Sequence, residues 1–397
     1  MFWDWFWEYG IVILFYVGVV ALIYFNRSKF HFENKIIAMY RTKIGLKLMD
    51  SIGGKHPRLI QFLGILGIYF GFLGMLFMVL FMGLGLYLMV FRPDLPALFA
   101  PVLPGIQIPG SPVKLPLIEG LIALFVVVVI HEFSHGVVSR AYNFKIKSSG
   151  FVMMGPLPGA FVEPDEKQLK KAPKKAQLSV FAAGPFSNIL LFGVILGIYL
   201  LGLAGASGIY EPTGIVIAGF VNESDSLYGA RLSELSIGEI ITKIDEYDVK
   251  SIYDVRDALS EKNPGDEVDL IQDNGSLTKI TLTSDPNNSS IPYLGLMLDS
   301  RVEPKDGLNK AFFSFIKTPL FWIFNVLYWI WVLSLGIGIV NLLPLGPTDG
   351  GRMYLLALTS WTEEKRALMI WSNTAKILLI ILAILVFVPM LRSLIVF

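Results

Sequence analysis

The chain of 397 residues contains no cysteine, so disulfides and thiolate metal ligands are both excluded. Charged residues are scarce at 16%, whereas 54% of the residues are hydrophobic. This balance excludes an ordinary soluble enzyme and indicates a polytopic α-helical membrane protein. The net charge of +1 gives no reason to expect a nucleic-acid partner. The first ten residues are aromatic and acidic, which is unlike a cleavable signal peptide and suits a membrane interface.

Six runs are apolar enough to cross a membrane, since a helical span needs roughly 20 apolar residues. The predicted spans are about 9–25, 59–91, 117–139, 178–204, 311–341 and 368–390. Cytoplasmic loops carry an excess of lysine and arginine. Loops 26–58 and 140–177 each hold eight such residues, whereas 92–116 holds two. We therefore expect the first two loops in the cytoplasm, and both termini, 92–116 and 205–310 outside.

The third predicted span carries ionisable residues where they are most costly. Residues 117–138 read LIEGLIALFVVVVIHEFSHGVV and include His131, Glu132 and His135. Two histidines four residues apart share one helix face, so both can bind one metal ion. Glu132 points about 100 degrees away, within reach of a metal-bound water. Ionisable groups inside a membrane span are rare and indicate a functional site.

A hydrolytic zinc site usually takes three protein ligands. The other two histidines, His31 and His56, lie in the first basic loop and are expected to be solvated there. Asp349 is the favoured third ligand, because it follows the fifth span at the depth expected for the histidine pair. Its segment, NLLPLGPTDGG at 341–351, contains helix-breaking prolines and glycines. Glu163 and Asp165 remain alternative ligands.

Two regions predict β-structure. Residues 207–300 are charged and contain short alternating runs, 214–219, 240–244 and 267–272, with a helix over 252–261. Asn274-Gly275 is a strong hairpin-turn signal between 268–273 and 277–282. We expect a small extracytoplasmic β-rich domain there. Residues 148–166 predict two strands, 150–154 and 159–163, around Gly155-Pro156; the alternative is a surface loop that dips into the headgroups.

Three motifs in order carry a resemblance to a known family. HEFSH at 131–135, GPFSN at 184–188, and Asn341, Pro344 and Asp349-Gly350 resemble the site-2 protease family of intramembrane zinc metalloproteases, over most of 117–351. The resemblance implies that His131, His135 and Asp349 hold one Zn²⁺ and that Glu132 is the general base on a zinc-bound water. Gly346 and Thr348 depart from the proline and leucine that the family often has before the aspartate.

The resemblance assigns supporting roles to other residues. Asn188 is expected to bind substrate or to donate to the oxyanion; the alternative is a hydrogen bond that ties span four to a neighbouring helix. Asn341 is expected to brace the Asp349 loop with Pro344 and Gly350, and Gly184-Pro185 to kink span four beside the metal. The predicted hairpin would pair with an unwound substrate segment by strand addition.

The inserted domain resembles the PDZ domains of this family, which bind peptide ends by strand addition. The resemblance rests on residues 226–230, 235–241, 244–249 and 264–266. The predicted divisions are a membrane region with two spans at 1–116, a catalytic core at 117–206, the PDZ-like domain at 207–305, and a membrane region with the Asp-Gly loop at 306–397.

The sequence therefore predicts a multi-pass cell-membrane zinc endopeptidase in contact with lipid, whose active site faces the cytoplasm. It would cleave transmembrane segments of single-span proteins. One alternative is a catalytically silent scaffold or chaperone that binds through the PDZ-like domain; the retained Glu132 and Asp349 argue against it. Another is a transporter with a proton or metal relay, for which ionisable residues spread over several spans are expected.

Overall fold

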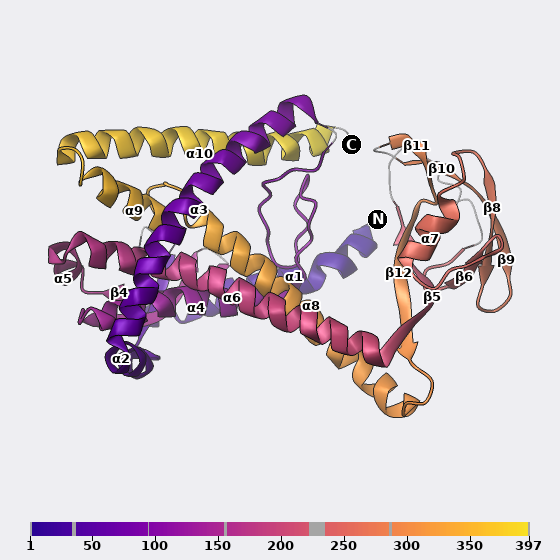
Figure 1. Ribbon diagram of the computed structural model, residues 1–397, viewed down its shortest axis with the longest axis horizontal. Helices are drawn as coiled ribbons and strands as arrows, with labels where there is room; N and C mark the ends of the chain where they lie inside the picture. The colour runs from indigo at the N-terminus through magenta and orange to yellow at the C-terminus, as the bar shows by residue number, and fades with distance from the viewer. Residues whose placement is uncertain are drawn as a thin grey trace. The chain divides into compact units, whose positions relative to one another are not determined.

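The computed structural model describes residues 2–33, 37–93, 95–154, 157–221, 235–285 and 288–395 (Figure 1). The chain divides into two compact units. The first, here the membrane unit, comprises Met1–Tyr199 and Ile323–Val396. The second, here the β-rich unit, comprises Leu200–Trp322. Two long helices begin in one unit and end in the other.

Long apolar helices dominate the membrane unit. The helices are α1 (Phe2–Phe25), α2 (Leu46–Lys55), α3 (Pro57–Phe91), α4 (Leu117–Ala141), α5 (Glu166–Lys171), α6 (Lys174–Ile209), α8 (Lys310–Val340), α9 (Asp349–Leu358) and α10 (Glu364–Ile395), with a short 3-10 turn, η1, at Arg27–Lys29. Of these, α3, α4, α6, α8 and α10 are long and apolar enough to cross a membrane. They match five of the six predicted spans. The apolar part of α1, Tyr9–Phe25, is shorter, so a sixth span stays a prediction.

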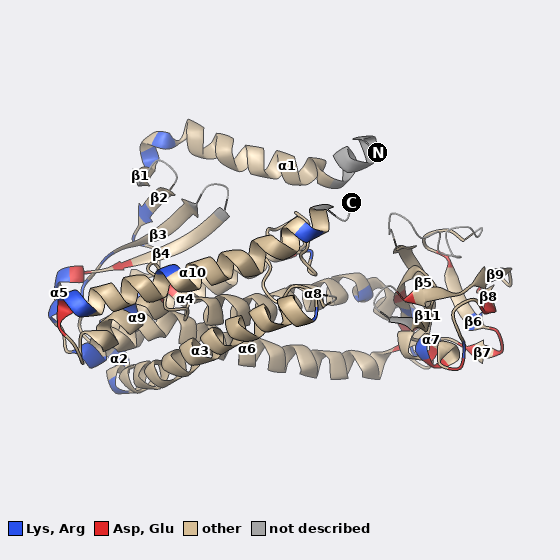
Figure 2. Cartoon of the chain, turned by 90° about the horizontal axis from the view of Figure 1, so that it is seen from above, with Lys and Arg blue, Asp and Glu red and all other residues tan. Residues whose placement is uncertain are grey.

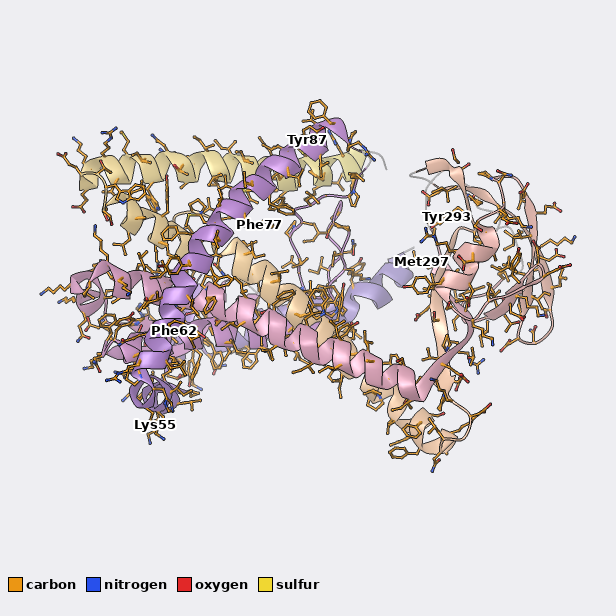
Figure 3. All side chains as sticks on the ribbon, in the orientation of Figure 1. Lys55, Phe62, Phe77, Tyr87, Tyr293 and Met297 are labelled. Carbon is orange, nitrogen blue, oxygen red and sulfur yellow. The ribbon has the colours of Figure 1, made fainter. Side chains whose placement is uncertain are left out.

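The second predicted span forms one unbroken helix of 35 residues, α3. Its buried face is a stripe of small and flexible residues, Gly64, Gly67, Gly71, Met75, Met78, Met82 and Gly85. Small residues let apolar helices approach closely where no hydrophobic effect drives them together. Phe62, Phe77 and Tyr87 are more than half exposed along the same helix (Figure 3), as expected for a lipid-facing surface.

A four-stranded antiparallel sheet also belongs to the membrane unit. Its strands are β1 (His31–Glu33), β2 (Ile37–Thr42), β3 (Ile146–Met154) and β4 (Leu157–Pro164), in that order. The predicted hairpin is thus confirmed as β3 and β4, although its expected turn, Gly155-Pro156, lies outside the described residues. The surface-loop alternative is wrong, because β3 and β4 pair along their length.

The treatment of 26–58 as a plain loop is also wrong. It contains β1, β2 and α2, and β2 pairs with β3 more than 100 residues later, with Met39 opposite Val152. The partner that satisfies the hydrogen bonds of β2 is remote, so local sequence gave little signal for the strand. His31 accordingly lies on β1; it and His56 are both exposed, as expected.

The β-rich unit confirms the alternating runs as strands. Its elements are β5 (Tyr210–Phe220), β6 (Ile240–Ile244), β7 (Tyr247–Asp248), α7 (Ile252–Leu259), β8 (Glu267–Gln272), β9 (Leu277–Thr281), β10 (Thr283–Asp285), β11 (Asn288–Tyr293) and β12 (Leu296–Pro304). The main sheet has the order β12-β5-β6-β8-β9, with β7 paired to β6. Gly275 takes a φ of 81° in the predicted β8–β9 turn. Inward side chains such as Ile215, Ile241 and Leu270 form an apolar core.

The PDZ-like character of this unit stays a prediction, and the stretch 226–230 that carried part of it lies outside the described residues.

Charge follows the expected pattern within the membrane unit. Figure 2 shows lysine and arginine at α2 and α5, while the middle stretches of α3 and α6 carry none. Near the basic residues of α2, Arg140 in the last turn of α4 pairs with Asp50 of α2 at 2.5 Å. The side of the membrane on which this end lies stays a prediction.

Candidate metal centre

Three predicted ligands from distant parts of the chain converge in the membrane unit. His131 and His135 lie one turn apart on α4, and Asp349 is the first residue of α9. The Nε2 atoms of His131 and His135 lie 3.0 and 3.3 Å from the same carboxylate oxygen, Oδ2 of Asp349. The candidate ligand atoms of the three residues all lie within 4.8 Å of one another. Tertiary packing therefore brings together the set that the sequence predicted.

The spacing of these atoms fits a tetrahedral zinc ion. Zinc bonds to nitrogen and oxygen of about 2.0–2.2 Å at tetrahedral angles put neighbouring ligand atoms roughly 3.3–3.5 Å apart. The separations to Asp349 come close to that value. The side chains of His131, His135 and Asp349 are only 7, 11 and 11% exposed. Two imidazoles and one carboxylate form a donor set that suits zinc and leaves a coordination position open.

Hydrogen bonds turn both imidazole rings so that Nε2 faces Asp349. Nδ1 of His135 donates to the main-chain carbonyl of Val180 on α6 at 2.6 Å. Nδ1 of His131 lies 3.2 Å from the side-chain amide nitrogen of Asn188, also on α6. At His135 the carbonyl acceptor takes the Nδ1 proton and leaves Nε2 free to bind a metal, as outer contacts commonly do at metal sites.

Asn188 is fully buried between helices. Besides its contact with His131, its main-chain carbonyl accepts a hydrogen bond of 2.8 Å from the Ser334 hydroxyl of α8. Its side-chain oxygen has no partner among the described residues. Asn188 therefore lies beside the metal ligands as predicted, and the contact of its side chain with His131 on α4 is also an interhelical bond of the kind that was the alternative. The role in substrate binding stays a prediction.

Gly184 makes room for the two histidines. A Cβ atom built on this residue would overlap the Nε2 atoms of both His131 and His135. The predicted kink at Gly184-Pro185 stays a prediction: α6 continues as one helix with Pro185 inside it. The space beside the imidazoles comes from the absent side chain, and it requires glycine at this position.

The loop between α8 and α9 delivers Asp349. The N–H of Gly350 donates to the carbonyl of Asn341 at 2.8 Å, so Asn341 contacts the loop as predicted, through its main chain. A Cβ on Gly350 would overlap the backbone of Leu342, which explains the glycine after the ligand. Pro344 is buried in the same loop, where no helical N–H is needed.

Two further residues hold this loop and were not predicted. Thr348 is the N-cap of α9: its hydroxyl accepts from the N–H of Gly351 at 3.1 Å and donates to the carbonyl of Leu343. A threonine just before a helix start is a recognisable N-cap signal, so the sequence contained the information. The indole of Trp371 on α10 donates to the carbonyl of Gly351 at 2.9 Å. No local pattern marks that contact.

The side chain of Glu132 extends from α4 to strand β4 of the sheet. Its carboxylate accepts a hydrogen bond of 3.2 Å from the main-chain N–H of Val162 on β4. The alternative ligands are engaged elsewhere. Glu163 accepts from Ser148 and pairs with Arg41 at 3.5 Å, while Asp165 caps α5. Backbone N–H donors of Gln168 and Lys167 hold the pKa of Asp165 below its usual value.

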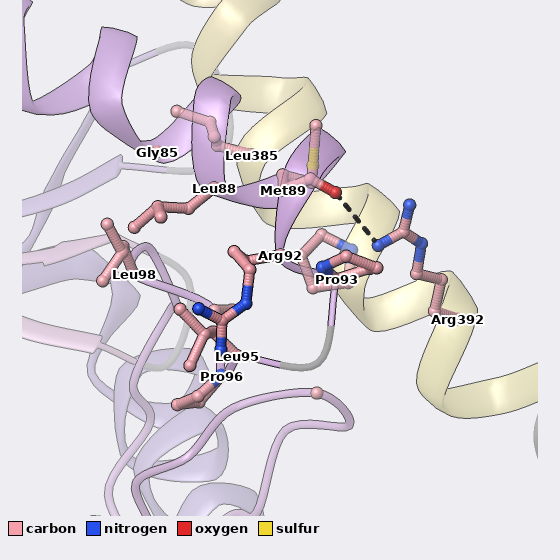
Figure 4. A pocket seen from close by; sticks show the side chains of 13 residues that line it. Gly85, Leu88, Met89, Arg92, Pro93, Leu95, Pro96, Leu98, Leu385 and Arg392 are labelled. Carbon is pink, nitrogen blue, oxygen red and sulfur yellow. Dashed lines mark hydrogen bonds between the residues drawn. The ribbon is translucent and has the colours of Figure 1, made fainter. Parts of the chain in front are cut away.

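A separate cavity of about 190 Å³ lies between the ends of α3 and α10 (Figure 4). Arg92 and Arg392 are among its lining residues, and the guanidinium of Arg392 donates to the carbonyl of Met89 at 3.4 Å. None of the predicted site residues lines this cavity. A long side chain at a helix end commonly reaches toward the membrane surface, which accounts for these arginines.

Comparisons with known proteins agree with this geometry. A sequence model of peptidase family M50 matches residues 119–385, which include all three motifs. An uncharacterized protein of Methanocaldococcus jannaschii is 28% identical over 345 residues, covering 86% of this chain and 83% of that protein. The zinc metalloprotease RasP of Shouchella clausii is 23% identical over 254 residues, covering 54% of this chain and 58% of RasP.

Proposed function

Since the chain belongs to peptidase family M50, we propose that it is a zinc endopeptidase that hydrolyses peptide bonds within or near the membrane-spanning segments of other proteins. The observation that carries the proposal is the convergence of His131, His135 and Asp349 beside Glu132, on helices apolar enough to span a membrane. The similarity to RasP, named a zinc metalloprotease, supports both the metal and the reaction class.

Zinc held by these three ligands would supply a Lewis acid and a water whose pKa is lowered toward about 7. Glu132 directly follows His131 on α4, so its side chain leaves the helix about 100 degrees around the axis from the side chain of His131. It takes the proton of the attacking water and transfers it to the leaving amine. The contact with Val162 holds the carboxylate between α4 and β4.

We propose that Asn188 hydrogen-bonds both the metal ligand His131 and the substrate. When Nε2 of His131 binds a metal, Nδ1 of the neutral ring carries a proton and needs an acceptor. A half-turn of the Asn188 amide places its oxygen on that N–H; the two amide orientations fill the same volume. The amide NH₂ then occupies the buried position where the oxygen has no described partner. There it is a donor for the developing oxyanion.

The proposed substrates are single-span membrane proteins. The membrane unit holds the site among apolar helices, so a substrate helix would enter from the lipid and unwind beside β4. The β-rich unit would bind peptide ends of the substrate as a PDZ-like domain. By the basic-loop rule, this unit and both termini are extracytoplasmic and the metal centre lies toward the cytoplasm.

The test is cleavage of a model single-span protein by the purified, zinc-loaded full chain in detergent, with products identified by mass spectrometry. Glu132→Gln keeps the shape of the side chain and removes its basicity. It is expected to lower cleavage by roughly 10²–10⁴-fold, the usual contribution of a general base, while zinc stays bound. His135→Ala is expected to remove both zinc and cleavage.

A matched control is Glu119→Gln, at the opposite end of α4 from the histidines, which should cleave at the wild-type rate. Normal turnover by Glu132→Gln would refute the proposed function. Wild-type protein that binds no zinc and cuts no substrate, yet retains peptide binding by its β-rich unit, would instead favour the scaffold alternative. Metal uptake into proteoliposomes would favour a transporter.

A further inference from the structure

The cavity of Figure 4 lies in the membrane unit, where α3 and α10 both end. Its walls come from the last turns of α3, from residues 95–98 with Gly110, and from α10 between Leu385 and Arg392. Because α3 begins next to α2 and runs on as one helix, the cavity lies at the opposite end of α3 from α2. Both helices are long enough to span a membrane, so their ends lie at the depth of the lipid headgroups.

Close packing gives the cavity fixed walls. A Cβ atom built on Gly85 of α3 would lie only 3.1 Å from a methyl carbon of Leu385, so the two helices meet tightly there. Gly110 has a φ of 75°, and a Cβ at this residue would overlap the backbone of Pro389 on α10. The concavity is therefore held by contacts of α10 with α3 and with the segment that follows α3.

Two arginines from distant parts of the chain line this cavity. Arg92 is the residue at which α3 ends, and Arg392 lies in the last turn of α10. Figure 4 shows Arg92 extending toward Leu95 and Arg392 extending toward Met89. An arginine offers five N–H donors. Arg392 uses one of them on the Met89 carbonyl and makes no other hydrogen bond or ion pair among the described residues.

The charge balance at this cavity favours an anion. Each helix C-terminus carries roughly half a negative elementary charge, so the ends of α3 and α10 together bring about one. Arg92 and Arg392 bring two positive charges, and none of the described residues that line the cavity is acidic. The helix dipoles account for basic residues here, yet about one positive charge is left over. A singly charged phosphodiester would balance it.

The rest of the lining and the size of the cavity favour a lipid over a small soluble anion. Leu88, Leu95, Leu98 and Leu385 give the wall an apolar surface. The volume is about 190 Å³, below the roughly 300–1,000 Å³ of pockets that enclose a whole small molecule. The cavity therefore suits one part of a larger ligand, and a phospholipid keeps its acyl chains in the surrounding bilayer.

We propose that this cavity binds the phosphate group of an anionic phospholipid. The guanidiniums of Arg92 and Arg392 donate to the phosphate oxygens, which the planar fork of arginine matches with paired hydrogen bonds. The glycerol and the first part of one acyl chain lie against the leucines. The bound lipid would join the ends of α3 and α10. The site is separate from the metal centre and does not rest on the proposed function.

The test titrates phosphatidylglycerol into the purified full chain in a neutral detergent, with Tm and lipid retention in native mass spectrometry as readouts. A ligand that binds only the folded protein raises Tm according to its affinity. We expect a clear rise with phosphatidylglycerol and a much smaller one with phosphatidylcholine, whose headgroup is neutral overall. Arg92→Gln and Arg392→Gln should each weaken binding about fivefold, the effect of one basic residue at an anionic membrane surface.

The matched control is Arg366→Gln, because Arg366 is exposed on the same helix as Arg392 and near the opposite end of it. It should bind phosphatidylglycerol as the wild type does. The comparison uses the lipid-dependent change in Tm, which the loss of the Met89 contact alone does not move. Equal phosphatidylglycerol affinity in Arg92→Gln, Arg392→Gln and Arg366→Gln would overturn the proposal.

Two other outcomes would also overturn it. Inorganic phosphate that stabilises the wild type as much as phosphatidylglycerol does would assign the cavity to a soluble anion. Asp94 lies outside the described residues, beside the lining residue Leu95 in the sequence. Binding of phosphatidylglycerol that appears in Asp94→Asn but not in the wild type would show that this carboxylate already neutralises the arginines.

Discussion

The two units of this chain bury different kinds of side chain. Of the buried polar residues described, all but Gln272 lie in the membrane unit, among them His131, Asn188 and Asp349. The β-rich unit instead has a core of aliphatic side chains, with its charges on the surface. Buried polar groups are costly unless they are paired. The metal centre pairs its polar groups with one another, so in the membrane unit polar contacts define the site, whereas in the β-rich unit apolar packing defines the fold.

The largest expected effect is a loss of zinc affinity from a substitution that disrupts only the membrane unit. In Gly184→Ala, the new methyl group overlaps both imidazoles, so zinc affinity should fall by roughly 10- to 100-fold or more, as when an outer contact of a metal ligand is lost. Zinc titration of the purified protein measures it. Gly193→Ala, on the same helix with open space around it, should bind zinc normally. Wild-type affinity in Gly184→Ala would mean that the centre does not lie against α6.

The converse substitution lowers the stability of the β-rich unit alone. Leu270 is fully buried in its core, so Leu270→Ala should destabilise that unit by about 2–5 kcal/mol. Hydrogen exchange of β6 and β8 measures the loss, and zinc affinity should not change. Leu277→Ala is the control, because Leu277 is 54% exposed. Loss of zinc in Leu270→Ala would show that the two units are energetically coupled.

A smaller effect tests the helix cap behind the third ligand. Thr348→Val keeps the side-chain shape and removes the hydroxyl that bonds Gly351 and Leu343, at a cost of about 1 kcal/mol. If the cap positions Asp349, zinc affinity should fall roughly fivefold, the factor that corresponds to this energy. Thr359→Val, at the other end of α9, should leave affinity unchanged. Equal zinc affinities for the two variants would show that the Thr348 cap does not position Asp349.

The smallest effect is a pH dependence confined to the β-rich unit. The N–H groups of Lys250 and Ser251 hold the pKa of Asp254 below its usual value at the start of α7. Its carboxylate therefore stabilises the fold above the ordinary aspartate pKa, and this contribution is lost as pH falls through the lowered value. Asp254→Asn should lose less stability on acidification than wild type in thermal unfolding. Tyr253→Phe, exposed on the same helix, should lose stability on acidification as wild type does.

Features that depend on neighbouring residues could be predicted from the sequence. Five spans, the β3–β4 hairpin and the strands of the β-rich unit follow from local apolar patterns and turn residues. The spacing of His131 and His135 follows from helix geometry alone. Strand β2 could not be predicted, because its partner β3 lies more than 100 residues away. Trp371 was missed for the same reason: its hydrogen bond to Gly351 joins two helices.

The sequence by itself determined the membrane class, the histidine pair on one face of a span, and the family motifs, since each is carried by composition or by spacing within one element. Only the tertiary structure decided that Asp349, 218 residues from His131, meets the pair, and that Glu132 contacts Val162 of β4. These contacts depend on how helices and strands pack. Packing arises from many weak contacts between remote residues, which no local pattern records.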